Sequence, residues 1–566
     1  MAIADVRNAS SSAATSEYEY VIVGAGSAGC VLVNRLTSDE RSRVLLLEAG
    51  PKDNTWMIRM PAALMYCLKN PKYSWCYETE PQKHVNQRRF FWPRGKVLGG
   101  SSSINAMVYI RGHPFDYDRW HQQEGADGWS YADCLPYFRK SQEHQLGADD
   151  YRGGDGPLYV SRGNSKNPLY QAFIDAGVQA GYPYTDDCNG YQQEGFGHFD
   201  MTIRNGTRCS TSIGYLKPAL GRSNLSVVTK ALVRRVLFEG TRAIGVEYED
   251  SRGEVVRVRA TKEVILSGGA INSPQLLMLS GVGNADELKK LDIPVVAHLA
   301  GVGQNLQDHL ELFVQQECTQ PLTLYRFQWK FPWNMIKAGI QWFTTSTGVA
   351  ATSHLEAGGF VRSIPGVPHP DIQFHFLPSV IVDHGQKMGT CHAYQVHVGT
   401  MRSLSKGWLR LRTPNPRDPP IIEPNYLSAE DDLRDLRACV RISREIFAQK
   451  AFEPFRGREL LPGTKAQTDR ELNAFILEHV ESAYHPSCTN KMGSPSDPMT
   501  VVDSKLRVVG IEGLRIVDAS VMPSVVSGNL NGPVIMMAEK AADLILGKPP
   551  LPRSTAPVWR PSNLVS

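Results

Sequence analysis

A glycine-rich turn near the amino terminus is the first group of residues with a recognisable chemistry. Residues 24–29 read Gly-Ala-Gly-Ser-Ala-Gly and directly follow an apolar, β-branched run that begins at Tyr18. The first glycine permits the tight bend, the second brings backbone amides close to a pyrophosphate, and the third lets helix and strand pack closely. The phosphates would then meet the positive end of a helix, which the apolar spacing of residues 27–36 predicts. Taken alone, such a turn could also be a bend without a ligand.

A carboxylate follows this turn at an informative spacing. Glu48 ends a second apolar run, residues 44–47, about 20 residues beyond the glycines, where a carboxylate can bind ribose hydroxyls. Strand, glycine turn, helix and strand form half of a doubly wound α/β domain. This unit predicts dinucleotide binding, but it does not separate FAD from NAD. The residues expected to bind the dinucleotide are Gly24, Gly26, Ser27, Ala28, Gly29, Glu48 and Ala49.

Three later motifs separate the two cofactors. They are Arg94–Asn105 (RGKVLGGSSSIN) followed by Arg111-Gly112, Gly269–Pro274 (GAINSP) with the downstream Ser280–Gly283, and Val517–Ser520 (VDAS) with Asn529-Leu530-Asn531. The consecutive amides of Gly99, Gly100 and Ser101 suit phosphate or flavin oxygens, although any one of these motifs could be an ordinary turn. Together and in this order, they resemble the signatures of the glucose–methanol–choline oxidoreductases. The resemblance runs from Tyr18 to about residue 546.

This resemblance implies that the cofactor is FAD. Some members attach FAD covalently through a histidine in the first signature, where this chain has Ile104, so non-covalent binding is expected. Position 106, a serine in related choline oxidases, is Ala106, which removes one hydroxyl. The further cofactor residues that the resemblance implies are Arg94, Val97, Gly99, Gly100, Ser101, Asn105, Ala106, Val233, Asp518, Ala519, Asn529 and Asn531.

Three residues are the candidates for catalysis. His485, in Tyr484–Cys488 (YHPSC), matches the family histidine that acts on the substrate hydroxyl, and an imidazole with a pKa of ~6.5 can accept that proton. Asn529 matches the second catalytic position, a histidine in other members, and its amide can hydrogen-bond an alkoxide. His375 matches a further histidine of choline oxidases that contacts the alkoxide. The alternatives are two structural histidines and a turn asparagine.

Glu311 is the candidate for substrate recognition. In choline-oxidising relatives the matching acidic residue faces the trimethylammonium group, which only charge and aromatic faces can recognise. The alternative is a solvated loop glutamate. The resemblance is strongest to the animal-type choline-oxidising members. It implies hydride transfer from choline to flavin N5, giving betaine aldehyde, with a second oxidation to glycine betaine left open.

The same resemblance implies a quinone-type electron acceptor and a place at the mitochondrial inner membrane. Residues 325–343, rich in aromatics and cations, could touch a lipid surface, or they could be a core or lid segment of the substrate domain. Three rival functions stay open: oxidation of another alcohol, a redox-silent lyase like the hydroxynitrile lyases of this fold, and a nicotinamide dehydrogenase.

The elements that must position these residues predict a two-domain α/β protein. A Rossmann-like FAD-binding domain is expected over 18–163, 217–300 and 480–550, interrupted by an α+β substrate domain with an antiparallel sheet over 164–216 and 301–479. Residues 1–17 and 551–566 are expected to be tails, the first a poor transit peptide because it contains Asp5 and one arginine. Later elements are expected as strands over 225–228, 233–239, 243–248, 255–260, 263–266, 371–376, 408–411 and 514–518, and as helices from Ser273, over 431–448 and over 533–546.

Composition bounds the remaining functions. Among 566 residues, 61 lysines and arginines nearly balance 57 aspartates and glutamates, which gives no electrostatic reason to expect nucleic acid. The ten cysteines are scattered without a CxxC pair, so neither a metal site nor a disulfide framework is expected. The sequence has no run of about 18 apolar residues, so no membrane span is predicted.

Overall fold

The computed structural model describes residues 16–163, 166–382 and 387–560. Most of the tail expected over 1–17 lies outside these ranges. Ser16 and Glu17 are not part of a tail, because they pair with Val258 and Arg259 and extend the first strand. At the other end, residues 551–560 have no regular structure, and Leu551 packs against the hydrophobic core that includes Val21 and Val31.

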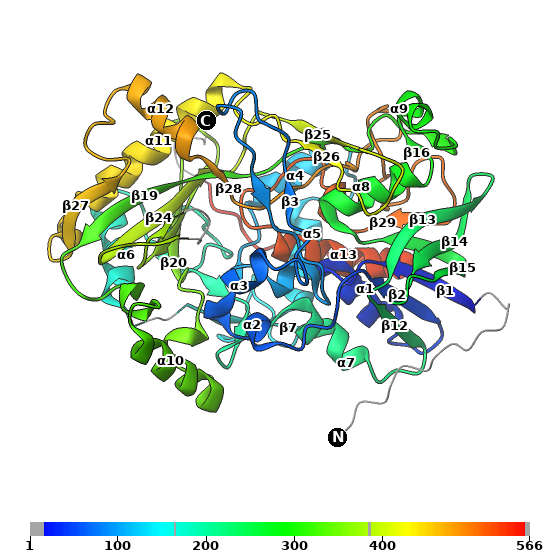
Figure 1. The fold of residues 1–566 in the computed structure, drawn as a ribbon, viewed down its shortest axis with the longest axis horizontal. Coiled ribbons are helices and arrows are strands. Elements are labelled where there is room, and N and C mark those ends of the chain that lie inside the picture. Colours follow the sequence, from blue (N-terminus) through cyan, green and yellow to red (C-terminus); the bar gives the residue numbers. More distant parts are fainter. Residues whose placement is uncertain (1–15, 164–165, 383–386, 561–566) are drawn as a thin grey trace.

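The first sheet has seven strands in the order β12-β2-β1-β15-β14-β13, with β29 beside β15 (right side of Figure 1). Strands β12, β2, β1, β15 and β29 run parallel, as a doubly wound fold requires, and β13 and β14 add an antiparallel hairpin. Residues 255–260 and 263–266 form one strand rather than two. The strands are β1 (Ser16–Val23), β2 (Val44–Glu48), β12 (Leu225–Thr229), β13 (Leu232–Glu239), β14 (Arg242–Glu249), β15 (Val255–Leu266) and β29 (Leu514–Ile516).

Two helices from opposite ends of the chain pack on this sheet. Helix α1 (Ser27–Leu36) follows β1, and α13 (Asn531–Ile545), red in the centre of Figure 1, lies beside it. Arg35 donates two hydrogen bonds, of 2.8 and 2.6 Å, to the fully buried Glu539. This bidentate ion pair fixes the two helices against each other.

Helix α8 (Gly269–Leu279) begins four residues before the predicted start at Ser273. Pro274 therefore lies inside the helix and not in its first turn. The cause is a tertiary cap, because Asp518 accepts hydrogen bonds from the Gly269 amide at 2.8 Å and from the Ser273 hydroxyl at 2.6 Å. The spacing of residues near Ser273 could not reveal a partner 249 positions away.

The second sheet is antiparallel, in the order β27-β19-β24-β21-β20-β8, with β28 beside β19. Its helices α6 (Pro168–Gln179), α11 (Glu430–Phe447) and α12 (Asp469–His479) pack against a core that includes Leu310, Leu312 and Val314. Since side chains alternate along a strand, Glu311 and Phe313 point to the opposite face. The strands are β8 (Gly195–His198), β19 (Leu310–Cys318), β20 (Ala357–Val361), β21 (Ile372–Leu377), β24 (Ala393–Thr400), β27 (Arg456–Leu461) and β28 (Glu481–Ser482).

Shorter elements connect the two sheets. Helix α10 (Pro332–Thr345) stands out from the body at the lower left of Figure 1. The other helices are α2 (Trp56–Arg59), α3 (Met65–Leu68), α4 (Pro114–Gln123), α5 (Tyr131–Ser141), α7 (Lys217–Ala219) and α9 (Ala285–Lys290). The remaining strands of three residues or more are β6 (Gln142–His144), β7 (Leu158–Arg162), β18 (Gln304–Leu306), β25 (Gly407–Arg410) and β26 (Ile421–Glu423).

Candidate active site

A cavity of about 1000 Å³ runs between the two sheets. One end is lined by Gly24 and Glu48 of the first sheet, and the other by Glu311 of the second sheet and by His485. Its size is at the upper end of the range for small-molecule sites. A ligand that reaches both ends must therefore be long, as a dinucleotide is.

Glycines at the first end lie so close to neighbouring backbone that a side chain would not fit. Gly24 has φ +101°, and a Cβ there would lie 2.5 Å from the Ser267 carbonyl oxygen. A Cβ on Gly29 would lie 2.0 Å from the Gly24 carbonyl oxygen, and one on Gly100 would lie 2.6 Å from the Cα of Gly26. The two glycine turns thus touch each other and expose backbone amides to the cavity, which is the arrangement that a pyrophosphate requires.

Glu48 lies at the end of β2 beside this turn. Its Oε2 accepts a hydrogen bond from the Ala25 amide at 2.9 Å, and its Oε1 accepts one from the Gly50 amide at 2.8 Å. Burial raises the pKa of Glu48 to about 7, although these hydrogen bonds oppose the rise. Each oxygen keeps a second lone pair, so the carboxyl group can still accept a ribose hydroxyl from the cavity.

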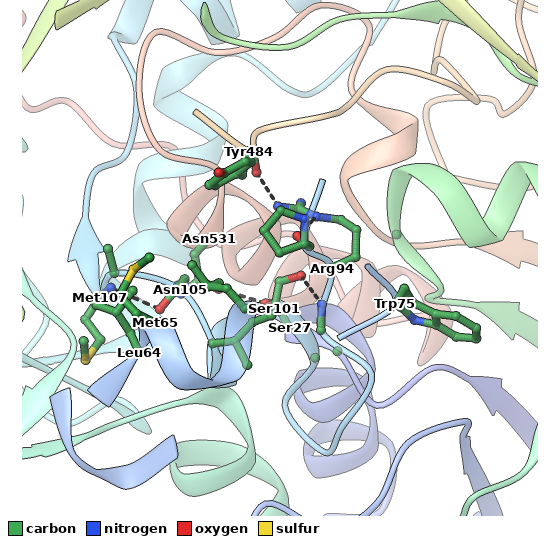
Figure 2. Close-up of a pocket in the computed structure, with 18 of the residues that line it drawn as sticks. Ser27, Leu64, Met65, Trp75, Arg94, Ser101, Asn105, Met107, Tyr484 and Asn531 are labelled. Carbon is green, nitrogen blue, oxygen red and sulfur yellow. Dashed lines mark hydrogen bonds between the residues drawn. The ribbon is translucent and has the colours of Figure 1, made fainter. Parts of the chain in front are cut away.

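The amino-terminal ends of α1 and α13 meet at the cavity. The Ser27 hydroxyl donates a 2.8 Å hydrogen bond to the side-chain oxygen of Asn531 (Figure 2). The positive ends of two helix dipoles therefore point to one region, which favours an anionic group there. The bare turn, the carboxyl group and the paired helix ends together fit FAD.

Sixteen of the predicted cofactor residues line the cavity: Gly24, Gly26, Ser27, Ala28, Glu48, Ala49, Arg94, Gly100, Ser101, Asn105, Ala106, Val233, Asp518, Ala519, Asn529 and Asn531. The other three pack behind its wall. Gly29 packs on Gly24, Val97 is fully buried in a cluster with Ile104, and the Gly99 amide donates to the Ala25 carbonyl at 2.7 Å. In the structure these three support the wall rather than form its surface.

At the other end, His485 and Asn529 are brought together. The Nε2 of His485 lies 3.2 Å from the Nδ2 of Asn529, and its Nδ1 lies 3.1 Å from the Nδ1 of His309. The Nε2 of His309 is 3.1 Å from the Met401 carbonyl, which can only accept, so His309 carries its proton there. Neutral His309 then accepts from His485 Nδ1–H, which leaves the lone pair of His485 on Nε2, toward Asn529.

The surroundings of His485 keep its imidazole neutral. Burial, followed by the nearby His309, Arg94 and His375, holds the pKa of His485 well below its usual value of 6.5. Its backbone amide donates a 2.8 Å hydrogen bond to Asp308, whose own pKa is raised by burial to about 6. A neutral imidazole with a fixed tautomer can act as a base.

The amide of Asn529 is also fixed in orientation. Its Oδ1 accepts from Gln373 Nε2 at 3.1 Å, so its Nδ2 faces His485. Gln373 Nε2 also lies 3.1 Å from His375 Nε2, and burial lowers the pKa of His375 to about 4. Gln373 donates to His375 Nε2, so the lone pair of that nitrogen is already used. A contact between His375 and an alkoxide therefore stays a prediction.

Glu311 lines the same end of the cavity on β19, and its side chain is 15% exposed. Its Oε1 lies 3.1 Å from the Nδ1 of His397 on β24. Phe313 lies two residues further along the strand, and the centroid of its ring is 4.5 Å from the centroid of the His397 ring. Tyr484 also lines the cavity, close to Arg94, which donates to its carbonyl at 2.6 Å (Figure 2). A carboxylate and two aromatic rings thus face the substrate end.

Several residues of this site were not predicted from the sequence. Asp308 and His309 precede Glu311 closely in the sequence, and this proximity was the only signal for them. Gln373 and His397 gave no signal, because a lone polar residue in an apolar strand shows nothing of its neighbours on other strands.

Comparisons with known proteins agree with this geometry. The family model for GMC oxidoreductases matches residues 18–311 with its amino-terminal part and residues 403–538 with its carboxy-terminal part. The chain belongs to the GMC oxidoreductase family. The predicted family, the α/β fold class with its antiparallel sheet, and the nature of the protein as an FAD-dependent oxidoreductase are confirmed.

Individual relatives are similar over nearly the whole chain. The chain is 62% identical to a mitochondrial choline dehydrogenase of Mus musculus, over 97% of this chain and 92% of that protein. It is 52% identical to an oxygen-dependent choline dehydrogenase of Brucella ovis, over 96% of this chain and 98% of that protein. The solved structure of pyridoxine 4-oxidase from Mesorbium loti is 32% identical, with a TM-score of 0.83, over 93% of this chain and 98% of that one.

Proposed function

We propose that this protein oxidises choline to betaine aldehyde. The observation that carries the proposal is the position of Glu311, whose carboxylate shares one end of the cavity with the base His485. A quaternary ammonium group can be held only by charge and by aromatic faces, and Phe313 and Tyr484 supply the latter. The similarity to two choline dehydrogenases supports the same substrate.

Four carboxyl groups line the cavity, and their partners differ. Glu48 and Asp518 accept hydrogen bonds from backbone amides, at the end assigned to the cofactor. Glu481 forms a 2.7 Å ion pair with Arg88, which compensates its charge. Glu311 has only an imidazole as its ion-pairing partner among the residues that the structure describes. Its charge is therefore the one most available to a substrate cation.

The residues around the alcohol suit proton removal. FAD, when bound, supplies the acceptor for the hydride. The hydroxyl proton of the substrate would pass to the Nε2 of His485, whose lone pair accepts from the Asn529 amide in the structure, so the substrate hydroxyl would take the place of that hydrogen bond. The second hydrogen of the Asn529 amide can donate to the resulting alkoxide without titrating. The hydrate of the aldehyde is again an alcohol, so the same groups would serve a second oxidation to glycine betaine.

Anaerobic mixing of the FAD-loaded enzyme with alcohols tests the substrate. We expect choline to bleach the oxidised flavin at millimolar concentration, and 3,3-dimethylbutan-1-ol, its neutral isostere, to bleach it only at much higher concentration. Bleaching by neutral alcohols without bleaching by choline would show that another alcohol is the substrate. Cleavage of mandelonitrile without flavin reduction would show a lyase.

We further propose that the electrons pass to a membrane quinone, in the mitochondrion, from an enzyme docked on the lipid surface. Segments 55–75 and 324–351 contain six lysines and arginines and no acidic residue. The segments contact each other, because the ring centroids of Trp56 and Phe343 are separated by 6.1 Å. We call them the cationic aromatic surface.

Large apolar side chains are unusually exposed on this surface. Trp329 is 76% exposed, Trp333 74% and Phe343 63%. Trp56, Trp329 and Phe343 also line the cavity, so the surface borders its opening. Aromatic and cationic groups together suit an anionic bilayer interface. The part of the chain that the structure describes contains no helix with the length and hydropathy of a membrane span.

Flotation with vesicles tests this docking. We expect the holoenzyme to float with vesicles containing phosphatidylglycerol and not with pure phosphatidylcholine. The double variant Trp333→Ser and Ile340→Ser removes two exposed side chains that do not line the cavity, so it should lose flotation and keep its choline activity with a soluble dye. Leu404→Ser, which removes a 60% exposed side chain elsewhere, is the matched control. Equal flotation of all three proteins would contradict the proposed surface.

A further inference from the structure

A chain of polar side chains lies along the cavity side of the second sheet. On β24, Gln395 and His397 alternate with the core residues Val396 and Val398. In register on β19, Gln315 lies opposite Gln395, and Phe313 lies opposite His397. Gln395 is completely buried, so its amide must find its partners within the protein.

Two contacts fix the orientation of the Gln395 amide. Its Oε1 accepts a 3.0 Å hydrogen bond from the backbone amide of Ile381 and a 3.1 Å hydrogen bond from Gln315 Nε2. Both partners are donors, so the reversed amide would place its own N–H groups against them. Gln395 Nε2 therefore faces His397 Nε2, at 2.7 Å.

This orientation decides which nitrogen of a neutral His397 ring carries the proton. Because Gln395 donates to its Nε2, that nitrogen must carry a lone pair, and the proton of a neutral ring is on Nδ1. Nδ1–H then donates to Glu311 Oε1 at 3.1 Å. A doubly protonated ring would place its Nε2–H against the N–H of Gln395, which costs free energy in a buried network.

We propose that Gln395 and His397 are positioning residues that set substrate specificity. The Glu311 carboxylate favours a second proton on His397, and the N–H of Gln395 that faces His397 Nε2 opposes it. Without that second proton, His397 orients the Glu311 carboxylate and does not cancel its charge. The titratable groups around His397 are Glu311 on β19, His375 on β21 and Glu481 beside β19, of which Glu481 is held by Arg88. This inference rests on the proposed choline function and explains how Glu311 remains available to a cation.

Steady-state kinetics with two alcohols test the inference. The readout is the ratio of kcat/KM for choline to kcat/KM for 3,3-dimethylbutan-1-ol, so that a general loss of activity cancels. In Gln395→Glu the new carboxylate accepts a hydrogen bond and draws a second proton onto His397. We expect the ratio to fall about tenfold near neutral pH, equal to about 1.4 kcal/mol, and to recover as rising pH removes that proton. The loss should appear in KM for choline and not in kcat.

His397→Gln is the conservative variant. Its amide can donate to Glu311 and accept from Gln395 but cannot become a cation, so the ratio should stay within about threefold of wild type. Glu311→Gln is the reference, because it removes the charge itself. If Glu311→Gln leaves the ratio unchanged, the proposed function of Glu311 fails. If Glu311→Gln lowers the ratio but Gln395→Glu does not, at any pH, the role of the Gln395–His397 pair fails and the choline function stands.

Discussion

Replacing Asn529 by aspartate should convert His485, the proposed base, into its conjugate acid. The Nδ2 of Asn529 lies 3.2 Å from the Nε2 of His485. A carboxylate at that distance would favour the imidazolium by about 5 kcal/mol at an effective dielectric constant of about 20. The pKa of His485, which burial now holds well below 6.5, would therefore rise strongly. A protonated His485 cannot accept the hydroxyl proton of the substrate.

The size of the effect follows from two separate losses. Asn529→Ala removes one donor to the alkoxide, which typically costs about 10²–10³ in rate, without protonating His485. Asn529→Asp should lose at least as much at neutral pH and then recover tenfold per pH unit as His485 is deprotonated. In the wild type, His485 is neutral already, so the rate should stay level down to about pH 6.5.

Anaerobic stopped-flow measurement of flavin reduction by choline, across pH, separates these cases. Asn205→Asp is the control, because it makes the same chemical change on an exposed turn. The reasoning is refuted if Asn529→Asp reduces its flavin within about threefold of wild type, or if its pH profile is parallel to that of Asn529→Ala.

Three further changes have defined outcomes. Gly29→Ala should abolish FAD retention, seen as loss of the flavin spectrum after purification, because its Cβ would lie 2.0 Å from a backbone oxygen, whereas Gly221→Ala has open space and should retain FAD. Glu48→Gln should remove a pH dependence of stability from the cofactor-free protein. Because the pKa of Glu48 is raised from 4.5 to about 7, its contribution to the free energy of unfolding is complete below pH 4.5. About 3 kcal/mol of that free energy is lost as the pH rises through 7, which urea unfolding can measure. His309→Leu should lower flavin reduction about 10²-fold with little change in the Kd for choline, because His485 Nδ1–H loses its acceptor, whereas His309→Asn should keep most of the rate.

Each of these expectations has a contrary result. A yellow, stable Gly29→Ala protein would mean that the turn can open. For Glu48→Gln, the contrary result is a free energy of unfolding that changes in parallel with that of wild type between pH 4.5 and 7. That result would mean that Glu48 is not a buried acid in the cofactor-free protein. Equal rates for His309→Leu and wild type would mean that the imidazole pair does not fix the tautomer of His485.

Local sequence patterns predicted the first sheet well. The apolar runs at 18–23 and 44–47 and the glycines between them specify strand, turn and helix through neighbours in the chain. The start of α8 was predicted wrongly because its cap, Asp518, comes from a distant segment. Strand β15 was predicted as two pieces because the exposed Thr261 and Lys262 interrupt its apolar pattern.

The residues that surround the reacting atoms were harder to predict together. Alternation along each strand predicts which residues share a face, but not which strand lies next to which. The register that places His397 opposite Phe313 on one side and His375 on the other depends on the order β19-β24-β21. The contact between His485 and Asn529 likewise depends on loops packed against both sheets. These contacts are properties of the tertiary fold.

The hydrogen bond between Ser27 and Asn531 has a consequence for how the enzyme is made. Its two residues are 504 positions apart, because Asn531 begins α13. The glycine turn is synthesised long before α13, so the opposite wall of the pocket does not exist until α13 has been made. We therefore expect tight capture of the cofactor only after α13 has been synthesised. A premature stop before α13 would produce a chain that keeps every residue of the glycine turn and still cannot assemble a flavin pocket.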